Sequence, residues 1–78
     1  MKIHVKYFGV IAEKTGRKEE KLELKPRITL SEFNDFIINK YHLNGIPFRI
    51  ALNENFEDNS TFIKKLDKVV LLPPFAGG

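Results

Sequence analysis

Cysteine is absent from the 78-residue sequence, and this absence excludes more than any other feature of the composition. Without a thiol there are no disulfide bonds, thiolate zinc sites, iron–sulfur clusters or cysteine nucleophiles. Only two histidines are present, so an all-histidine metal centre within one chain is not expected. We expect His4 on the solvent-facing side of a strand and His42 at a helix end, where a cation favours the helix dipole.

Long hydrophobic runs and an excess of one charge are also lacking. No apolar stretch approaches the roughly 20 residues that a membrane helix needs, and the chain does not open with a basic and then apolar leader. Thirteen basic and ten acidic residues are mixed along the chain and give a net charge of +3. Nucleic-acid-binding surfaces instead concentrate positive charge on one patch. We therefore expect a cytoplasmic protein that binds neither membranes nor nucleic acid.

The length of the chain limits what it can do alone. We expect residues 1–78 to form one domain with one small core. Such a domain has little room for a concave pocket on the order of several hundred Å³. The composition therefore favours a module that works with a larger partner, with no metal and no permanently bound cofactor.

Alternating residues predict strands in the first third of the chain. In residues 2–8, Ile3, Val5 and Tyr7 share one face, which is typical of a strand. Gly9 breaks this pattern, and residues 10–15 predict a short helix that ends at Gly16. The charged residues 18–24 predict a second strand near a sheet edge, where lysine and glutamate discourage pairing with other chains.

The main helix is predicted after Pro26. Thr29 and Glu32 have capping-box spacing, so each side chain can bond the other's backbone amide. Asn44 and Gly45 are expected to stop the helix. Its apolar stripe, predicted to face the core, consists of Leu30, Phe33, Phe36, Ile37 and Tyr41.

The rest of the chain predicts two more strands. Residues 48–52 indicate a third strand, followed by a turn-rich stretch around Phe56. Residues 62–66 predict a short helical turn. Residues 69–72 are consecutively apolar, which is typical of a strand covered on both faces at the centre of a sheet. The predicted fold class is α+β, with one amphipathic helix packed on one mixed sheet.

The C-terminal tail, residues 73–78, carries the most specific chemical signal. Pro73 and Pro74 favour extended geometry, and the six residues reach at most about 20 Å. Gly77 and Gly78 lack a Cβ and can thread a narrow channel. We expect a flexible tail that delivers its own α-carboxylate into another protein's active site. That carboxylate is inert until it is activated, for example as an acyl-adenylate.

This tail, together with Tyr7-Phe8-Gly9, the capped helix, residues 51–53 and Leu66-Asp67, resembles the small sulfur-carrier subunits of molybdopterin synthase. The resemblance covers essentially the whole chain and implies the β-grasp, ubiquitin-like fold. It implies that an E1-like enzyme uses ATP to adenylate the Gly78 carboxylate, which then becomes a thiocarboxylate. The sulfur would go to a cyclic pyranopterin precursor in the large synthase subunit, within a heterotetramer. The partner-binding residues that it implies are Phe8, Pro73, Pro74, Phe75, Ala76 and Gly77.

Three positions depart from the family pattern. Ala12 stands where an arginine is frequent, Leu66 where a glycine is common, and Phe75 is bulkier than expected. Three other readings also stay open: a thiamine-type sulfur carrier, a ubiquitin-like protein modifier, and a plain interaction domain. The diproline before Gly-Gly favours the molybdopterin pathway over the thiamine one.

Overall fold

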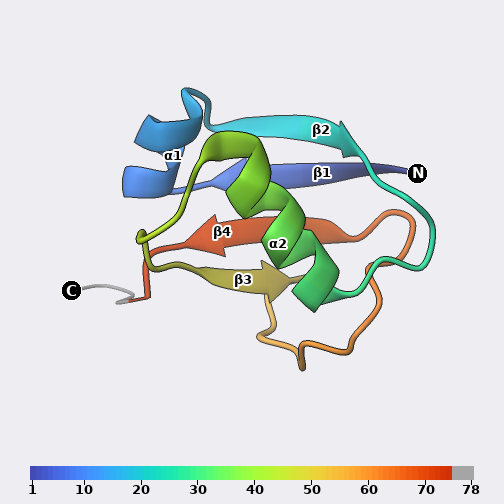
Figure 1. Ribbon diagram of the computed structural model, residues 1–78. Coiled ribbons are helices and arrows are strands. Elements are labelled where there is room, and N and C mark those ends of the chain that lie inside the picture. The colour runs from blue at the N-terminus through green and yellow to red at the C-terminus, as the bar shows by residue number, and fades with distance from the viewer. Residues whose placement is uncertain (75–78) are drawn as a thin grey trace.

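The computed structural model describes residues 1–74, which form four strands and two helices (Figure 1). The short helix α1 and its left-handed C-cap at Gly16 (φ 78°) are as predicted. None of the helices in residues 1–74 is long and apolar enough to cross a membrane. In chain order the elements are β1 (Lys2–Tyr7), α1 (Val10–Thr15), β2 (Glu19–Glu23), α2 (Leu30–Tyr41), β3 (Arg49–Leu52) and β4 (Lys68–Leu72).

The strands form one mixed sheet in the order β2-β1-β4-β3. β1 and β4 run parallel at its centre, with His4 opposite Lys68 and Tyr7 opposite Leu71. β2 and β3 pair antiparallel on the two outer sides. The predicted α+β class and β-grasp fold are confirmed, with β4 central and β2 at an edge.

Helix α2 begins with the predicted capping box. The Thr29 hydroxyl accepts a hydrogen bond from Glu32 N–H at 3.1 Å, and the Glu32 carboxylate accepts one from Thr29 N–H at 3.0 Å. The helix ends at Tyr41, before the predicted stop at Asn44 and Gly45. His42 forms the C-cap in the left-handed region (φ 56°).

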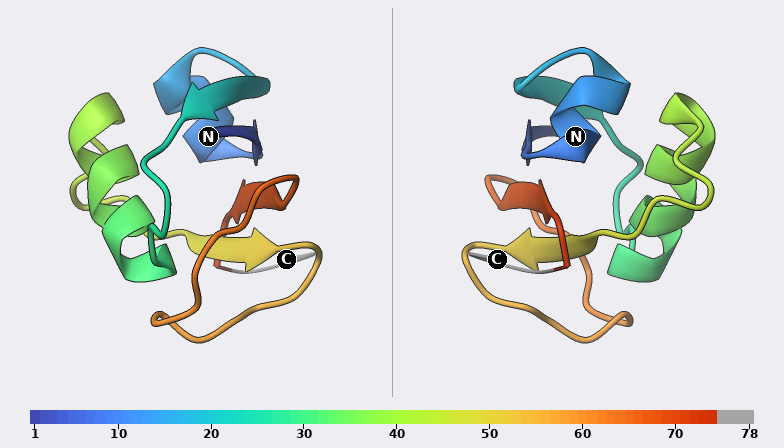
Figure 2. Two further views of the ribbon diagram at one scale, coloured as in Figure 1. Left: turned by 90° about the vertical axis from the view of Figure 1, so that its right-hand side faces the viewer. Right: turned by 90° about the vertical axis from the view of Figure 1, so that its left-hand side faces the viewer.

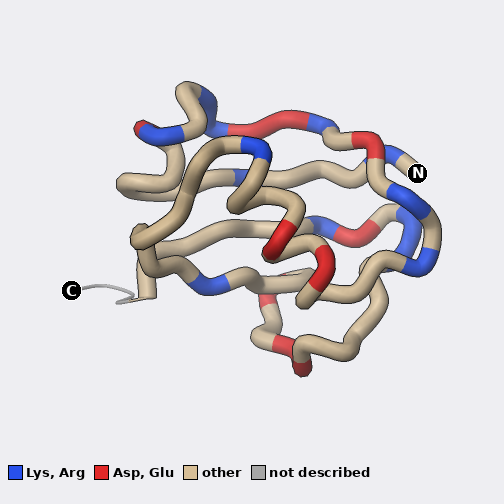
Figure 3. The backbone as a smooth tube through the Cα atoms, viewed as in Figure 1, with Lys and Arg blue, Asp and Glu red and all other residues tan. Residues whose placement is uncertain are grey.

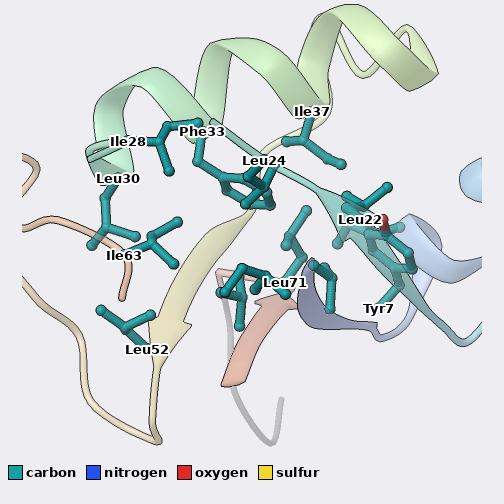
Figure 4. Close-up of a cluster of buried hydrophobic side chains, with 14 of the residues drawn as sticks. Tyr7, Leu22, Leu24, Ile28, Leu30, Phe33, Ile37, Leu52, Ile63 and Leu71 are labelled. Atoms are coloured by element: carbon teal, nitrogen blue, oxygen red, sulfur yellow. The ribbon is translucent and has the colours of Figure 1, made fainter. Parts of the chain in front are cut away.

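The core lies between α2 and one face of the sheet (Figures 2 and 4). Phe33 and Ile37 are fully buried there, beneath the alternating inward residues of β1 and β4. Phe36 was predicted on the same buried stripe, and this was wrong because its side chain is 37% exposed. Phe36 lies at the margin of the apolar stripe, where the surface of the helix turns away from the sheet. Tyr41, also predicted on this stripe, is only partly buried.

The predicted helical turn over residues 62–66 is also wrong. Ile63 N–H donates to the carbonyl of Ile28 at 2.8 Å, and Phe62 bridges Thr29, so this segment is extended beside the start of α2. A turn follows, in which the Asp67 carboxylate accepts a hydrogen bond from Lys64 N–H at 2.7 Å. Leu66 lies in that turn at φ 74° and is 86% exposed.

The last strand is fully covered on one face only. Val69 and Leu71 face α2 and are fully buried, whereas Val70 and Leu72 on the opposite face are partly exposed. The prediction that residues 69–72 are covered on both faces was therefore wrong. Figure 2 shows α2 on one side of the sheet, and the described chain leaves the other side open.

Candidate functional site

The C-terminal segment leaves the sheet at the end of the central strand β4, beside the residues that follow β1. Phe8 N–H donates to the carbonyl of Leu71 at 3.1 Å, which extends the parallel pairing by one bond. Gly9 then turns the backbone into α1 with φ at 61°. Pro73 follows Leu72 and has no N–H with which to continue the ladder. Phe8, Gly9 and Pro73 thus meet at one end of the molecule.

Three of the predicted partner-binding residues lie at this end. Phe8 is 47% exposed, and Pro73 and Pro74 are partly buried. Phe75, Ala76, Gly77 and Gly78 lie outside the described residues, so their roles stay predictions. The sequence reasoning placed Tyr7 in the core, and that is confirmed by its 2% exposure.

An open hollow of about 420 Å³ lies beside Phe8. The apolar Phe8 and Ala12 line it together with the charged Lys6, Lys18 and Glu19. Val10, two residues beyond Phe8, is exposed as well. We call Phe8, Val10, Pro73 and Pro74 the Phe8 surface. It combines exposed apolar area with neighbouring charges of both signs, a composition suited to a protein partner.

A second surface, the open face of the sheet, was missed by the sequence reasoning. Its apolar part lies on β3 and β4 and consists of Val70 and Leu72, which are partly exposed, and Ala51, which is 5% exposed. Arg49 pairs with Leu72 across the strands, and its guanidinium lies 3.6 Å from the ring centroid of exposed Phe56. The sequence did not predict this exposed face, because the consecutive apolar residues of β4 are typical of a strand that is buried on both sides.

A largely buried carboxylate, that of Glu20, connects three elements at one corner of the fold. Glu20 projects from β2 toward α2, and its side chain is only 10% exposed. It accepts hydrogen bonds from the hydroxyls of Tyr7 and Tyr41, both at 2.5 Å, and from Arg17 Nη1 at 3.0 Å. The two tyrosine rings meet edge to face with centroids 5.9 Å apart. The cluster ties the ends of β1 and α2 to β2.

The contacts within this cluster shift the pKa values of Tyr7 and Glu20. Burial and the Glu20 carboxylate together raise the pKa of Tyr7, which keeps its phenol a donor. Burial by itself raises the pKa of Glu20, but the hydrogen bonds from Tyr41 and Tyr7 and the charge of Arg17 outweigh it and lower that pKa below 4.5. The ionised carboxylate is therefore the form that the folded protein stabilises.

Glu20→Gln is expected to lower the free energy of unfolding by about 1–3 kcal/mol at neutral pH, because a charged acceptor for buried donors is lost. Since the folded protein depresses the pKa of Glu20, this stability is present above pH 4.5 and is lost as pH falls through the folded-state pKa. Urea unfolding at about pH 7 and about pH 3 measures both effects. The difference in unfolding free energy between wild type and variant should be smaller at the acidic pH. An equal difference at both pH values would contradict the conclusion that the ionised Glu20 carboxylate stabilises the fold.

The two histidines take structural positions, as predicted. His4 lies on the open face, where its Nε2 is 2.5 Å from a Glu19 carboxylate oxygen at the charged edge of the sheet. Figure 3 shows acidic and basic residues interspersed along that edge strand, β2. Within residues 1–74, no group of three histidine, aspartate or glutamate side chains is placed to hold a metal ion.

Known proteins of similar sequence and structure share this architecture. A molybdopterin synthase sulfur carrier subunit from Drosophila melanogaster is 28% identical over 81 residues, covering 97% of this chain and 90% of that protein. A putative molybdopterin converting factor subunit 1 from Pyrococcus furiosus superposes with a TM-score of 0.89 at 22% identity, covering 96% of this chain and 99% of that one.

A structure of the complex of subunits 1 and 2 of the molybdopterin-converting factor from Helicobacter pylori contains a chain that is 27% identical. It matches with a TM-score of 0.70, covering 100% of both chains. The model of the ThiS family matches residues 5–78. Because that match spans nearly the whole sequence, the chain belongs to the ThiS family.

Proposed function

We propose that this protein is the small, sulfur-carrying subunit of a molybdopterin synthase. The observation that carries the proposal is the position of the C-terminal segment, which starts from the central strand β4 beside the exposed Phe8 surface. The name of the Drosophila melanogaster relative, which matches over almost the whole of both chains, supports the same role.

The chemistry is that of an activated carboxylate. The Gly78 carboxylate attacks the α-phosphorus of ATP in an E1-like enzyme, which forms an acyl-adenylate and releases pyrophosphate. A donor that supplies sulfur at the oxidation level of hydrosulfide attacks the acyl carbon, AMP leaves, and a thiocarboxylate remains on Gly78. The sulfur passes to a cyclic pyranopterin precursor, and the carboxylate is restored when water supplies the oxygen. This chain contributes the carrier group, while its partners contribute the catalytic sites.

The proposed partner for transfer is the large subunit of the synthase, in a heterotetramer. The Helicobacter pylori complex of subunits 1 and 2 supports a pairing of this kind. Phe8, Pro73 and Pro74 offer an apolar contact at the base of the tail, and Phe75, Ala76 and Gly77 lead Gly78 into the partner. An exposed aromatic residue beside a delivery segment is a suitable anchor for such an interface.

Intact mass separates this function from the alternatives. The protein is incubated with a candidate activating enzyme, ATP and a sulfur donor. A gain of about 16 Da, the difference between sulfur and oxygen, is expected on the carrier. Conjugates to lysines of other proteins without this gain would instead indicate a ubiquitin-like modifier. Conversion of the pyranopterin precursor by the product and a large subunit distinguishes the molybdopterin pathway from a thiamine-type carrier.

A further inference from the structure

We propose that the contact between Gly9 and Pro73 sets the direction in which the C-terminal segment leaves the sheet, so that Gly9 is a positioning residue for sulfur transfer. The inference rests on the proposed function, because direction matters only if the Gly78 carboxylate is the reacting group. It concerns two residues that lie far apart in the sequence and meet at the base of the tail.

Pro73 occupies the space that a side chain at position 9 would need. A Cβ on Gly9 would lie 2.8 Å from Cγ and 3.6 Å from Cδ of Pro73. Nonbonded carbon atoms ordinarily approach to about 3.5–4.0 Å, so the shorter separation is a clash. The proline ring can therefore pack at this point only because residue 9 has no side chain.

Backbone hydrogen bonds on both sides of Gly9 hold it in place, so it cannot move away from the Pro73 ring. On one side, Phe8 N–H is bonded to the carbonyl of Leu71 at 3.1 Å. On the other, the Gly9 carbonyl accepts hydrogen bonds from the first turn of α1, from Ala12 N–H at 3.1 Å and Glu13 N–H at 3.4 Å. Gly9 thus joins the end of the sheet rigidly to α1.

Pro73 is the less constrained partner. The last residue of β4 that pairs with β3 is Leu72, opposite Arg49, and Pro73 has no N–H with which to extend that pairing. Bulk added at position 9 therefore displaces Pro73. Because Pro73 is the first residue beyond β4, its displacement redirects the chain that follows. A misplacement of about 1 Å in a reacting group can lower a rate by about 100-fold.

Gly9→Ala alone does not isolate the contact, because φ is +61° at this position and alanine is strained there in any case. Gly16→Ala is the control for a positive φ alone. Gly16 has φ at +78° at the other end of α1, and a Cβ there meets nothing within 4 Å among residues 1–74. Its ψ of 16° lies in the left-handed helical region, whereas Gly9 has ψ at −137°, so the control carries milder backbone strain and no contact to Pro73. Pro73→Ala removes Cγ and Cδ, and with them the atoms that clash.

The experiment uses chemically thiocarboxylated protein, the large subunit and the pyranopterin precursor. We compare the wild type, the three single variants and the Gly9→Ala/Pro73→Ala double variant. Three quantities are measured for each: the maximal transfer rate, the concentration of the thiocarboxylated protein that gives half of that rate, and the unfolding midpoint. Gly9→Ala should lower the maximal rate at least tenfold and change the half-saturating concentration by less than about threefold. Gly16→Ala should lose less stability than Gly9→Ala and transfer at the wild-type rate, because its backbone strain is milder and lies away from Pro73. In the Pro73→Ala background, Gly9→Ala should cost little further rate.

Equal rate losses for Gly9→Ala and Gly16→Ala would overturn the proposal. A rate loss from Gly9→Ala that is the same with and without the Pro73→Ala substitution would overturn it as well. If Gly9→Ala does not fold, Pro73→Gly tests the contact from the other side. It should lower the maximal rate more than Pro74→Gly, since among residues 1–74 Pro73 alone has atoms within 4 Å of the added Cβ. Equal effects would count against the contact. Absence of transfer by thiocarboxylated wild type would refute the proposed function, and this inference with it.

Discussion

Deleting Gly77 and Gly78 is expected to abolish sulfur transfer while leaving the unfolding midpoint nearly unchanged. The deletion removes the carboxylate-bearing glycine and shortens the reach of the tail by about 7 Å. It spares the core, because Leu71 is the last buried hydrophobic residue in the described chain. Single-turnover conversion of the pyranopterin precursor measures the first effect, and thermal unfolding measures the second. A loss of more than about 1 kcal/mol of stability would mean that the tail packs on the domain.

Phe8→Ala is the complementary variant. It keeps the tail and removes the exposed aromatic side chain at its base, so binding to the large subunit should weaken roughly tenfold. Its stability should stay within about 1 kcal/mol of wild type, because Phe8 is 47% exposed. If the tail deletion and Phe8→Ala both left transfer intact, delivery would not occur from this end of the molecule.

Phe33→Ala is expected to have the largest effect on stability, a loss of about 3–5 kcal/mol, as is usual for truncating a buried phenylalanine. Phe33 is fully buried between α2 and the sheet. The whole folding free energy of such a domain is only about 5–15 kcal/mol, so the variant is expected to be partly unfolded at physiological temperature. Urea unfolding followed by circular dichroism measures the loss.

Phe36→Ala is the matched control on the same helix. Phe36 makes a tilted contact with Phe33, their centroids 6.3 Å apart, but is 37% exposed. Its truncation should cost about 1 kcal/mol. Equal losses for the two variants would show that the helix presents a different face to the sheet.

Local signals were sufficient to predict most of the fold. Thr29 and Glu32 marked the start of α2 because a capping box depends only on residues three apart. The alternation of Ile3, Val5 and Tyr7 defined the buried face of β1 because strand side chains alternate regardless of what covers them. For the site, the same reasoning predicted a last strand that ends at the diproline, whereas Phe8 was expected as a partner contact only from the family resemblance.

What local signals could not provide were contacts between distant segments. Glu20 looks like any glutamate in a charged strand, yet it accepts bonds from tyrosines 13 residues before and 21 residues after it. Residues 62–66 have apolar spacing that also suits a helical turn, but Ile63 N–H donates to the carbonyl of Ile28 and Phe62 lies opposite Thr29 in an antiparallel bridge. The packing of Pro73 on Gly9 likewise depends on the parallel register of β1 and β4, which no local pattern specifies.

The parallel pairing at the middle of the sheet also constrains biosynthesis. His4 and Lys68, which are opposite each other there, lie 64 positions apart (68 minus 4). A ribosome makes β1 early and β4 late, so β1 has only β2 as a neighbour until the last residues emerge. Contacts of such wide sequence separation slow folding. Chains that stop before residue 68 lack the strand that joins the two halves of the sheet, and a folded domain therefore indicates that translation has passed through β4 to the diproline.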